Sequence, residues 1–114
     1  MSFEIHSERV GSVLVLGVEG ELLLSQKLRV SSAHVRGAGD ATAVLVDLAA
    51  CTRVDSAGLG ELLMWYSLAA RDGRKMMLCG ATERIRQMIK IARVDGILLH
   101  ARDREAGLAE LGRD

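Results

Sequence analysis

The sequence contains no proline, and it is poor in aromatic residues. Without proline, the turns of the chain have to be formed by residues such as glycine, aspartate and serine. Aromatic residues make up 3% of the chain, and the formal net charge is zero because 15 Lys and Arg balance 15 Asp and Glu. A protein that binds nucleic acid is usually basic or offers aromatic rings for base stacking, so we expect no direct contact with nucleic acid.

Cysteine and long apolar runs are also scarce. Cys51 and Cys79 form no Cys-x-x-Cys pair and lie in no Cys/His cluster, which argues against a disulfide-stabilised secreted module. The longest apolar stretch, Leu62–Ala70, is too short to span a membrane, and residues Met1–Val10 contain no apolar signal core. We therefore expect a soluble cytoplasmic protein that does not insert into a membrane.

The size and composition of the chain predict one ordinary globular core. Of its 114 residues, 49% are hydrophobic and 26% are charged. This balance supports a buried core, and the length suits one such core and not two. We therefore expect a single domain over residues 1–114.

The order of apolar patterns predicts strands alternating with helices. Alternation over Phe3–Glu8, a turn at Gly11 and Ser12, and a β-branched run over Val13–Val18 predict an antiparallel hairpin. Further strands are expected at Ala43–Leu48, Lys75–Cys79 and Ile97–Leu99, and helices at Ser25–Arg36, at Ser56–Arg71, from the N-cap Thr82 to Gly96, and from the N-cap Asp103 through Leu111. This order predicts an α/β domain with a mixed, mostly parallel sheet, an N-terminal antiparallel hairpin and about four helices.

One segment combines polar residues with glycine where a central strand gives way to the most apolar helix. It reads Val54-Asp55-Ser56-Ala57-Gly58-Leu59-Gly60. Functional sites of open α/β sheets gather at the C-terminal ends of strands, so this segment is the candidate site. The structural alternative is that Asp55 or Ser56 only caps the helix, and that Gly58 and Gly60 only let it pack closely.

Known catalytic and cofactor motifs are absent from the sequence. Val54 stands where the Gly-x-Ser-x-Gly nucleophile turn needs its first glycine, and no third glycine completes a dinucleotide motif after Gly58 and Gly60. No Gly-Lys-Ser/Thr occurs, and Asp47 and Asp55 lack the partners of an acid–base or metal set. The three histidines, His6, His34 and His100, also lack the sequence context of a catalytic triad. We expect no enzyme, no catalytic residue, no metal and no cofactor; a small enzyme is the least favoured class.

Several segments together resemble the STAS domain, the fold shared by anti-sigma factor antagonists and the cytoplasmic tails of sulfate transporters. The resemblance extends from Phe3 to Leu111 and depends most on Asp55-Ser56-x-Gly58-Leu59 in the setting of this strand order. The other matching segments are Gly20-Glu21-Leu22, Val44–Leu48, the strand from Gly73 to Gly80, and the helix with Thr82, Ile85, Met88 and Ile89.

The resemblance implies specific site residues. In bacterial antagonists of this family the serine directly after the aspartate is phosphorylated by a partner kinase, and that position is Ser56. A second Ser or Thr often follows, but here the residue is Ala57; the family usually has Asp where this chain has Leu23, which is a departure on the partner-facing surface. The expected partner-binding residues are Glu21, Asp55, Ser56, Ala57, Gly58, Leu59 and Gly60.

The resemblance also implies a function. The chain is expected to bind an anti-sigma factor with serine-kinase activity when unphosphorylated, to release it when phosphorylated on Ser56, and to be reset by a PP2C-type phosphatase. Nucleotide and magnesium then belong to the kinase. The alternative is a STAS accessory subunit of a lipid-transport ABC complex that docks on its ATPase. Met64 and Trp65, which lie off the main apolar stripe of their helix, suit either a weak homodimer or burial against the fourth helix.

Overall fold

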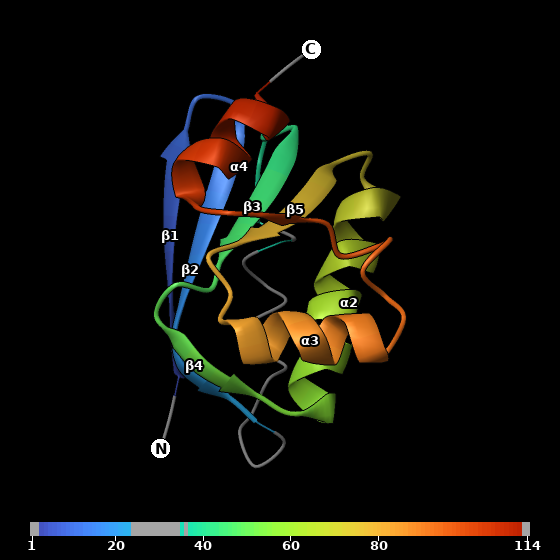
Figure 1. Cartoon of the computed structure of the whole chain (residues 1–114). Helices are drawn as coiled ribbons and strands as arrows, with labels where there is room; N and C mark the ends of the chain where they lie inside the picture. Colours follow the sequence, from blue (N-terminus) through green and yellow to red (C-terminus); the bar gives the residue numbers. More distant parts are fainter. Residues whose placement is uncertain (1–2, 24–34, 36, 113–114) are drawn as a thin grey trace.

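The computed structural model describes residues 3–23, 35 and 37–112 (Figure 1). The helix expected over Ser25–Arg36 lies, apart from Val35, outside the described residues. The elements are β1 (Phe3–Val10), β2 (Val13–Leu22), β3 (Ala43–Asp47), β4 (Cys51–Val54), α2 (Ser56–Arg71), β5 (Lys75–Cys79), α3 (Glu83–Ile91), β6 (His100–Ala101) and α4 (Arg104–Leu111).

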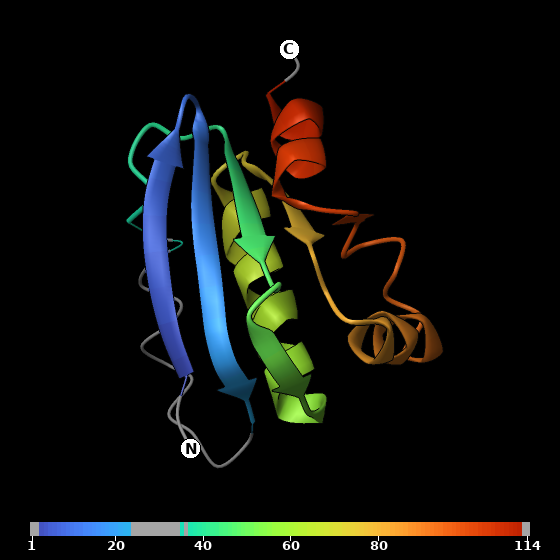
Figure 2. The same cartoon turned by 60° about the vertical axis from the view of Figure 1, so that its left-hand side comes forward.

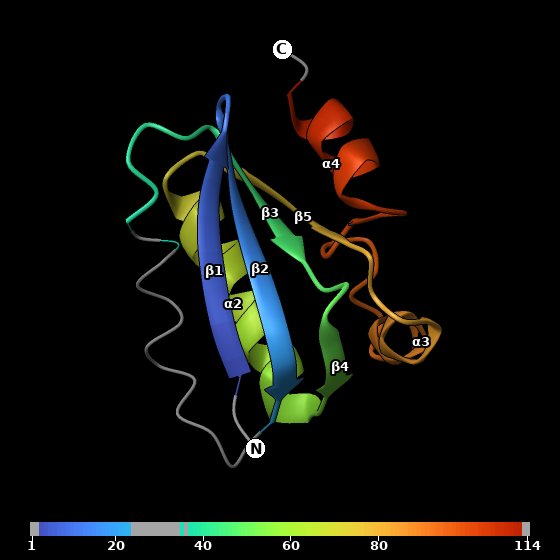
Figure 3. The ribbon, with the colours of Figure 1, turned by 90° about the vertical axis from the view of Figure 1, so that its left-hand side faces the viewer.

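These strands form one mixed sheet in the order β1-β2-β3-β5-β6. β1 and β2 pair antiparallel, whereas β2 with β3, β3 with β5, and β5 with β6 pair parallel. β4 also pairs parallel with β2, beyond the point where β3 ends, so β3 and β4 follow one another along the same long strand (Figures 2 and 3). The predicted α/β fold with an N-terminal hairpin is confirmed.

The two faces of the sheet bury separate hydrophobic clusters. One cluster joins α2 and α3 to the sheet, and alternate strand residues such as Leu16, Val46 and Leu78 contribute to it. The other lies beneath α4 and is built from the intervening residues, among them Val15 and Leu45. The alternation of side chains along a strand therefore gives the central strands apolar residues on both faces.

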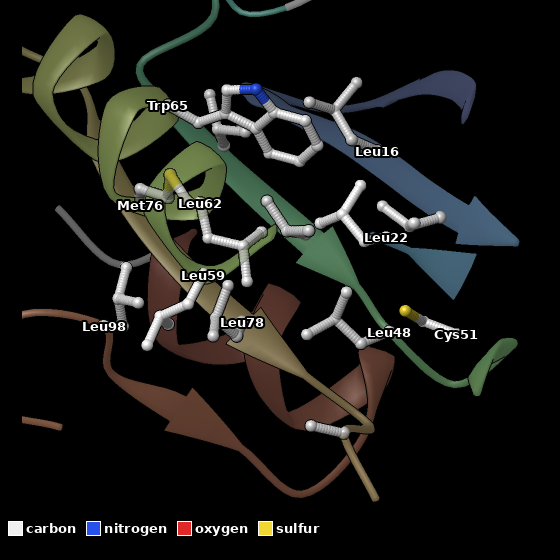
Figure 4. Packing of buried hydrophobic residues seen from close by; sticks show 14 of the residues in the cluster. Leu16, Leu22, Leu48, Cys51, Leu59, Leu62, Trp65, Met76, Leu78 and Leu98 are labelled. Carbon is white, nitrogen blue, oxygen red and sulfur yellow. The ribbon is translucent and has the colours of Figure 1, made fainter. Parts of the chain in front are cut away.

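Trp65 lies at the centre of the first cluster. Its side chain is 0% exposed and packs near Leu16 of β2 (Figure 4). The indole Nε1–H donates a hydrogen bond to Glu61 Oε2 at 2.8 Å, one helical turn earlier. The only tryptophan of the chain is therefore buried with its single polar group paired.

The burial of Trp65 corrects two expectations about this helix. The sequence placed Trp65 off the main apolar stripe of the helix, whereas the structure buries it together with Leu68 and Ala69. Trp65 faces the sheet and is not covered by α4, which lies on the opposite face. It is also unavailable for a homodimer surface, although Met64 beside it is 53% exposed.

Two strand predictions were wrong. β4 was not expected, because Thr52 and Arg53 are polar and exposed and leave no apolar run to detect. The last strand was expected at Ile97–Leu99, but pairing with β5 begins at His100, opposite Leu78. Ile97 and Leu99 are 42% and 50% exposed, so Leu98 is the only residue of this apolar run that is buried.

The start of α2 is packed against the end of β2 at Gly58. A Cβ on Gly58 would lie 2.1 Å from the carbonyl oxygen of Leu22, which is far inside van der Waals contact. The same oxygen accepts a hydrogen bond from the backbone N–H of Asp55 at 3.3 Å. Only glycine at this position lets the two backbones approach so closely.

No helix in the described part of the chain is long and apolar enough to cross a membrane.

We expect Gly58→Ala to lower the free energy of unfolding by about 3 kcal/mol, because the new methyl group must displace backbone. Gly60→Ala is the matched control, since nothing lies within 4 Å of a Cβ there. That change should raise stability by about 0.5–1 kcal/mol through helix propensity. Urea titrations followed by Trp65 fluorescence measure both; equal effects of the two substitutions would contradict the packing at Gly58.

A second prediction concerns Glu61. Glu61→Ala leaves the buried indole N–H of Trp65 without its acceptor and should lower the free energy of unfolding by about 1–3 kcal/mol. Glu61→Gln keeps an acceptor oxygen at the same reach, so its loss should stay below about 1 kcal/mol. The same urea titrations report both values. A loss as large in Glu61→Gln as in Glu61→Ala would show that charge, and not the hydrogen bond, stabilises this turn.

Candidate functional site

Asp55 caps α2, and Ser56 is the first residue of the helix. The backbone of Asp55 is extended, with φ −100° and ψ −174°, and its side-chain Oδ1 accepts a hydrogen bond from the backbone N–H of Gly58 at 2.9 Å. Its carbonyl oxygen accepts from the N–H of Leu59 at 2.8 Å. Of the two capping residues that the sequence left open, Asp55 performs the capping.

Ser56 is exposed. Because Asp55 supplies the cap, the Ser56 hydroxyl is not needed to satisfy the backbone of the first turn. The first turn of α2 contains no acidic residue, so the positive end of the helix dipole meets no charge from the helix itself beyond the cap. The hydroxyl therefore stands at a rigid, accessible position where an added anion is electrostatically favoured.

The other expected site residues divide by burial. Gly60 is exposed, and Glu21, Asp55 and Ala57 are half-buried. Gly58 and Leu59 are buried and face the chain's own sheet. The structure thus brings the segment together at one end of the sheet, where Gly58 and Leu59 fix α2 and the remaining residues stay accessible.

Glu21 is tied to this end of the sheet by a residue that the sequence analysis missed. β2 and β4 align Glu21 with Arg53, and Arg53 Nη1 lies 3.3 Å from Glu21 Oε2. The Glu21 carboxylate is only 16% exposed, whereas the Arg53 side chain is 65% exposed. Opposite charges at cross-strand positions are the signal for this pair, but the signal is visible only once β4 is known.

A cleft of about 410 Å³ runs between β4 and α3 beside this segment. Its rim contains two exposed arginines, Arg53 from β4 and Arg84 from α3, and its floor is apolar. The residues that line it are Thr52, Arg53, Val54, Arg84, Ile85 and Met88. Arg84 is exposed on α3, so this side of α3 borders the candidate site.

A second pocket at the same edge of the sheet contains the side chains of Arg86, His100 and Arg102. His100 Nε2 accepts a hydrogen bond from the backbone N–H of Ala81 at 3.1 Å. Burial, reinforced by the nearby Arg86, lowers the pKa of His100 from its usual value. His100 is therefore neutral near pH 7, and the positive charge of this pocket comes from the arginines.

The cysteines are unsuited to catalysis or metal binding. Both Cys51 and Cys79 are buried free thiols. Burial raises the pKa of the Cys51 thiol and raises the pKa of Cys79 to about 12. A protonated, enclosed thiol is neither a nucleophile nor a ligand, so these residues serve as small core side chains.

Comparison with known proteins supports the family assignment. The family model described as "Mlab, STAS domain" matches residues 5–100. Among curated proteins, none matches the chain in sequence.

Solved structures share this fold. An anti-sigma factor antagonist from Mycobacterium paratuberculosis has a TM-score of 0.84 at 18% identity, with 98% of this chain and 96% of that chain covered. SpoIIAA is similar in its unphosphorylated form (TM-score 0.73, 18% identity, 97% and 99% covered). Its phosphorylated form from Bacillus is also similar (TM-score 0.71, 17% identity, 94% and 98% covered). A serine-to-glutamate variant of RsbS from Moorella thermoacetica has a TM-score of 0.78 at 19% identity, with 93% and 95% covered.

At these identities the structures share the fold with this chain. The family model, in contrast, matches the sequence itself over residues 5–100, which is most of the chain. The same span holds the capped start of α2 and the strand order that surrounds it. This protein therefore belongs to the STAS domain family.

Proposed function

We propose that this protein is an anti-sigma factor antagonist in a phosphorylation-controlled partner switch. Unmodified, it binds an anti-sigma factor with serine-kinase activity; phosphorylated on Ser56, it releases that partner. The observation that carries the proposal is the exposed Ser56 at the first position of α2, relieved of capping by Asp55.

The local structure suits a phosphoserine. A phosphate brings about −1.5 to −2 charges at neutral pH and accepts several hydrogen bonds. At Ser56 it would lie beside the backbone N–H groups of the first turn and at the positive dipole end of α2. The arginines Arg53 and Arg84 on the neighbouring cleft add positive charge to the same end of the molecule. The domain can therefore accept the group without loss of its fold.

A partner docked over Ser56 is affected differently. Like charges brought together at an interface cost several kcal/mol, and the half-buried Asp55 already places one carboxylate beside the serine. A change from about 1:99 to 99:1 in occupancy needs roughly 5.5 kcal/mol of differential affinity. The free-energy cost of one phosphate, together with that of the contacts it displaces, is of this size. A single modification can therefore act as the switch.

The similar structures support the modification. SpoIIAA has been solved in both a phosphorylated and an unphosphorylated form, and its fold is that of this chain. The partners that follow from the proposal are a serine kinase, which brings its own nucleotide and magnesium, and a PP2C-type phosphatase that resets the switch. In this proposal the protein acts in the cytoplasm as one domain over residues 1–114. It catalyses no reaction and makes no direct contact with nucleic acid.

The second candidate is the STAS accessory subunit of a lipid-transport ABC complex, docked on its ATPase. The description of the matched family model names Mlab and the STAS domain, and it does not name anti-sigma factor antagonism. The family match is therefore compatible with both candidates. Docking on an ATPase needs no phosphorylation of Ser56. The two candidates therefore differ in how binding responds to a negative charge at that position.

Pull-down experiments with the kinase-fold ATPase encoded nearest to this gene test the proposal. Ser56→Ala should bind at least as well as the wild type, whereas Ser56→Asp should bind more weakly by about tenfold or more, since each tenfold is about 1.4 kcal/mol. Ser67 is an exposed serine on the same helix and provides the matched controls Ser67→Ala and Ser67→Asp, which should bind normally. Equal binding by Ser56→Ala and Ser56→Asp would refute the switch, and equal binding to a transporter ATPase would favour the second candidate.

Intact-mass spectrometry after incubation with the same kinase and ATP tests the acceptor directly. One added phosphate is expected on the wild type and on Ser67→Ala, and none on Ser56→Ala. Fragment spectra should place the phosphate on Ser56. A phosphate that persists in Ser56→Ala would assign the modification to another residue.

A further inference from the structure

A cluster of potential metal ligands lies on the N-terminal hairpin, on the face of the sheet opposite α2. Glu4 and His6 are two residues apart on β1 and therefore share a face, and Glu19 of β2 is the direct partner of Glu4 in the antiparallel register. One imidazole nitrogen and one carboxylate oxygen from each glutamate lie within 4.8 Å of one another. All three side chains are accessible, with exposed fractions of 60–68%.

The spacing of these atoms fits a shared cation better than direct hydrogen bonds. His6 Nε2 lies 3.4 Å from Glu4 Oε1 and 3.5 Å from Glu19 Oε1. Both distances exceed the 2.7–3.2 Å or so of an N–H···O hydrogen bond. Ligand atoms placed about 2.1 Å from a tetrahedral zinc ion are separated by roughly 3.4 Å, which is the edge of the tetrahedron. The ring nitrogen thus faces both carboxylates at the separation that a bridging ion requires.

The scaffold beneath the cluster is a continuously paired two-stranded ladder. β1 and β2 pair continuously from Phe3 with Gly20 to Val10 with Val13. Gly17 is the register partner of His6 and contributes no side chain, and the nearest side-chain atom to a Cβ built on Gly17 is Nη2 of Arg104, at 3.9 Å. Arg104, the cation near Gly17, is held by Glu8 and Asp47 at 3.0 and 2.9 Å, which partly neutralise its charge.

We propose that Glu4, His6 and Glu19 form a zinc-binding site, with water completing the coordination. One imidazole with two carboxylates is a donor set that suits Zn²⁺, whereas Mg²⁺ and Ca²⁺ prefer oxygen ligands alone. The site is independent of the partner switch, because its residues belong to β1 and β2 on the face that α2 does not cover. The competing explanation is a protonated His6 paired with the two glutamates, which would bind no metal.

Zinc titration of the untagged full chain by isothermal calorimetry tests the site. One Zn²⁺ per chain is expected, with no measurable heat from Mg²⁺ under the same conditions. His6→Ala, Glu4→Gln and Glu19→Gln should each weaken the affinity by at least about tenfold, since even outer-shell changes at metal sites cost 10–100-fold. Glu83→Gln is the control, because Glu83 is an exposed carboxylate of α3, which packs on the other face of the sheet; it should bind as the wild type does.

Paramagnetic mapping gives a second, independent readout. Co²⁺ added to the ¹⁵N-labelled protein should broaden the amide signals around Glu4, His6 and Glu19 and leave those around Ser56 and His100 sharp. Trp65 fluorescence during urea titration confirms that each variant is folded. Zinc affinity that is unchanged in His6→Ala, that depends on His6 but on neither glutamate, or that is absent from the wild type would overturn the proposal.

Discussion

The close contact between the start of α2 and the end of β2 is the constraint on which the site depends. Gly58 lies against the carbonyl group of Leu22, and the same carbonyl accepts the N–H of Asp55. This contact fixes the axis of α2, while Asp55 closes its first turn. Ser56 lies between Asp55 and Gly58 in the sequence, is not needed as the helix cap, and has an exposed side chain. The accessible hydroxyl is therefore a consequence of how tightly its neighbours are held.

The division of β3 and β4 explains why polar residues gather at this end. β3 is apolar on both faces because helices cover it on both sides. After the turn at residues 48–50, β4 continues along β2 but is exposed at Thr52 and Arg53. The same long strand thus pairs first with a core strand and then with a surface strand. This change brings Arg53 and Glu21 beside the start of α2.

The sequence predicted the parts of this protein that depend on periodicity and local chemistry. Apolar runs located the buried strands, and the motif around Asp55 and Ser56 located the start of α2. Periodicity failed where long-range packing decides. Trp65 is buried against the sheet although it lies off the apolar stripe, Leu99 is exposed although it is apolar, and β4 is a strand although it is polar. The Arg53–Glu21 pair and the β4–α3 cleft were not predicted for the same reason, since they exist only after distant strands have paired.

The enclosed sulfur atoms have a consequence for the conditions in which this domain keeps its structure. Cys51 and Cys79 are the only cysteines of the chain, and burial keeps both thiols protonated. Thiols react with peroxide or with disulfides as thiolates, and accessibility governs the rate. Oxidative stress therefore leaves the folded domain chemically unchanged at cysteine. The fold that presents Ser56 therefore stays the same, as far as its cysteines are concerned, in oxidising and in reducing surroundings.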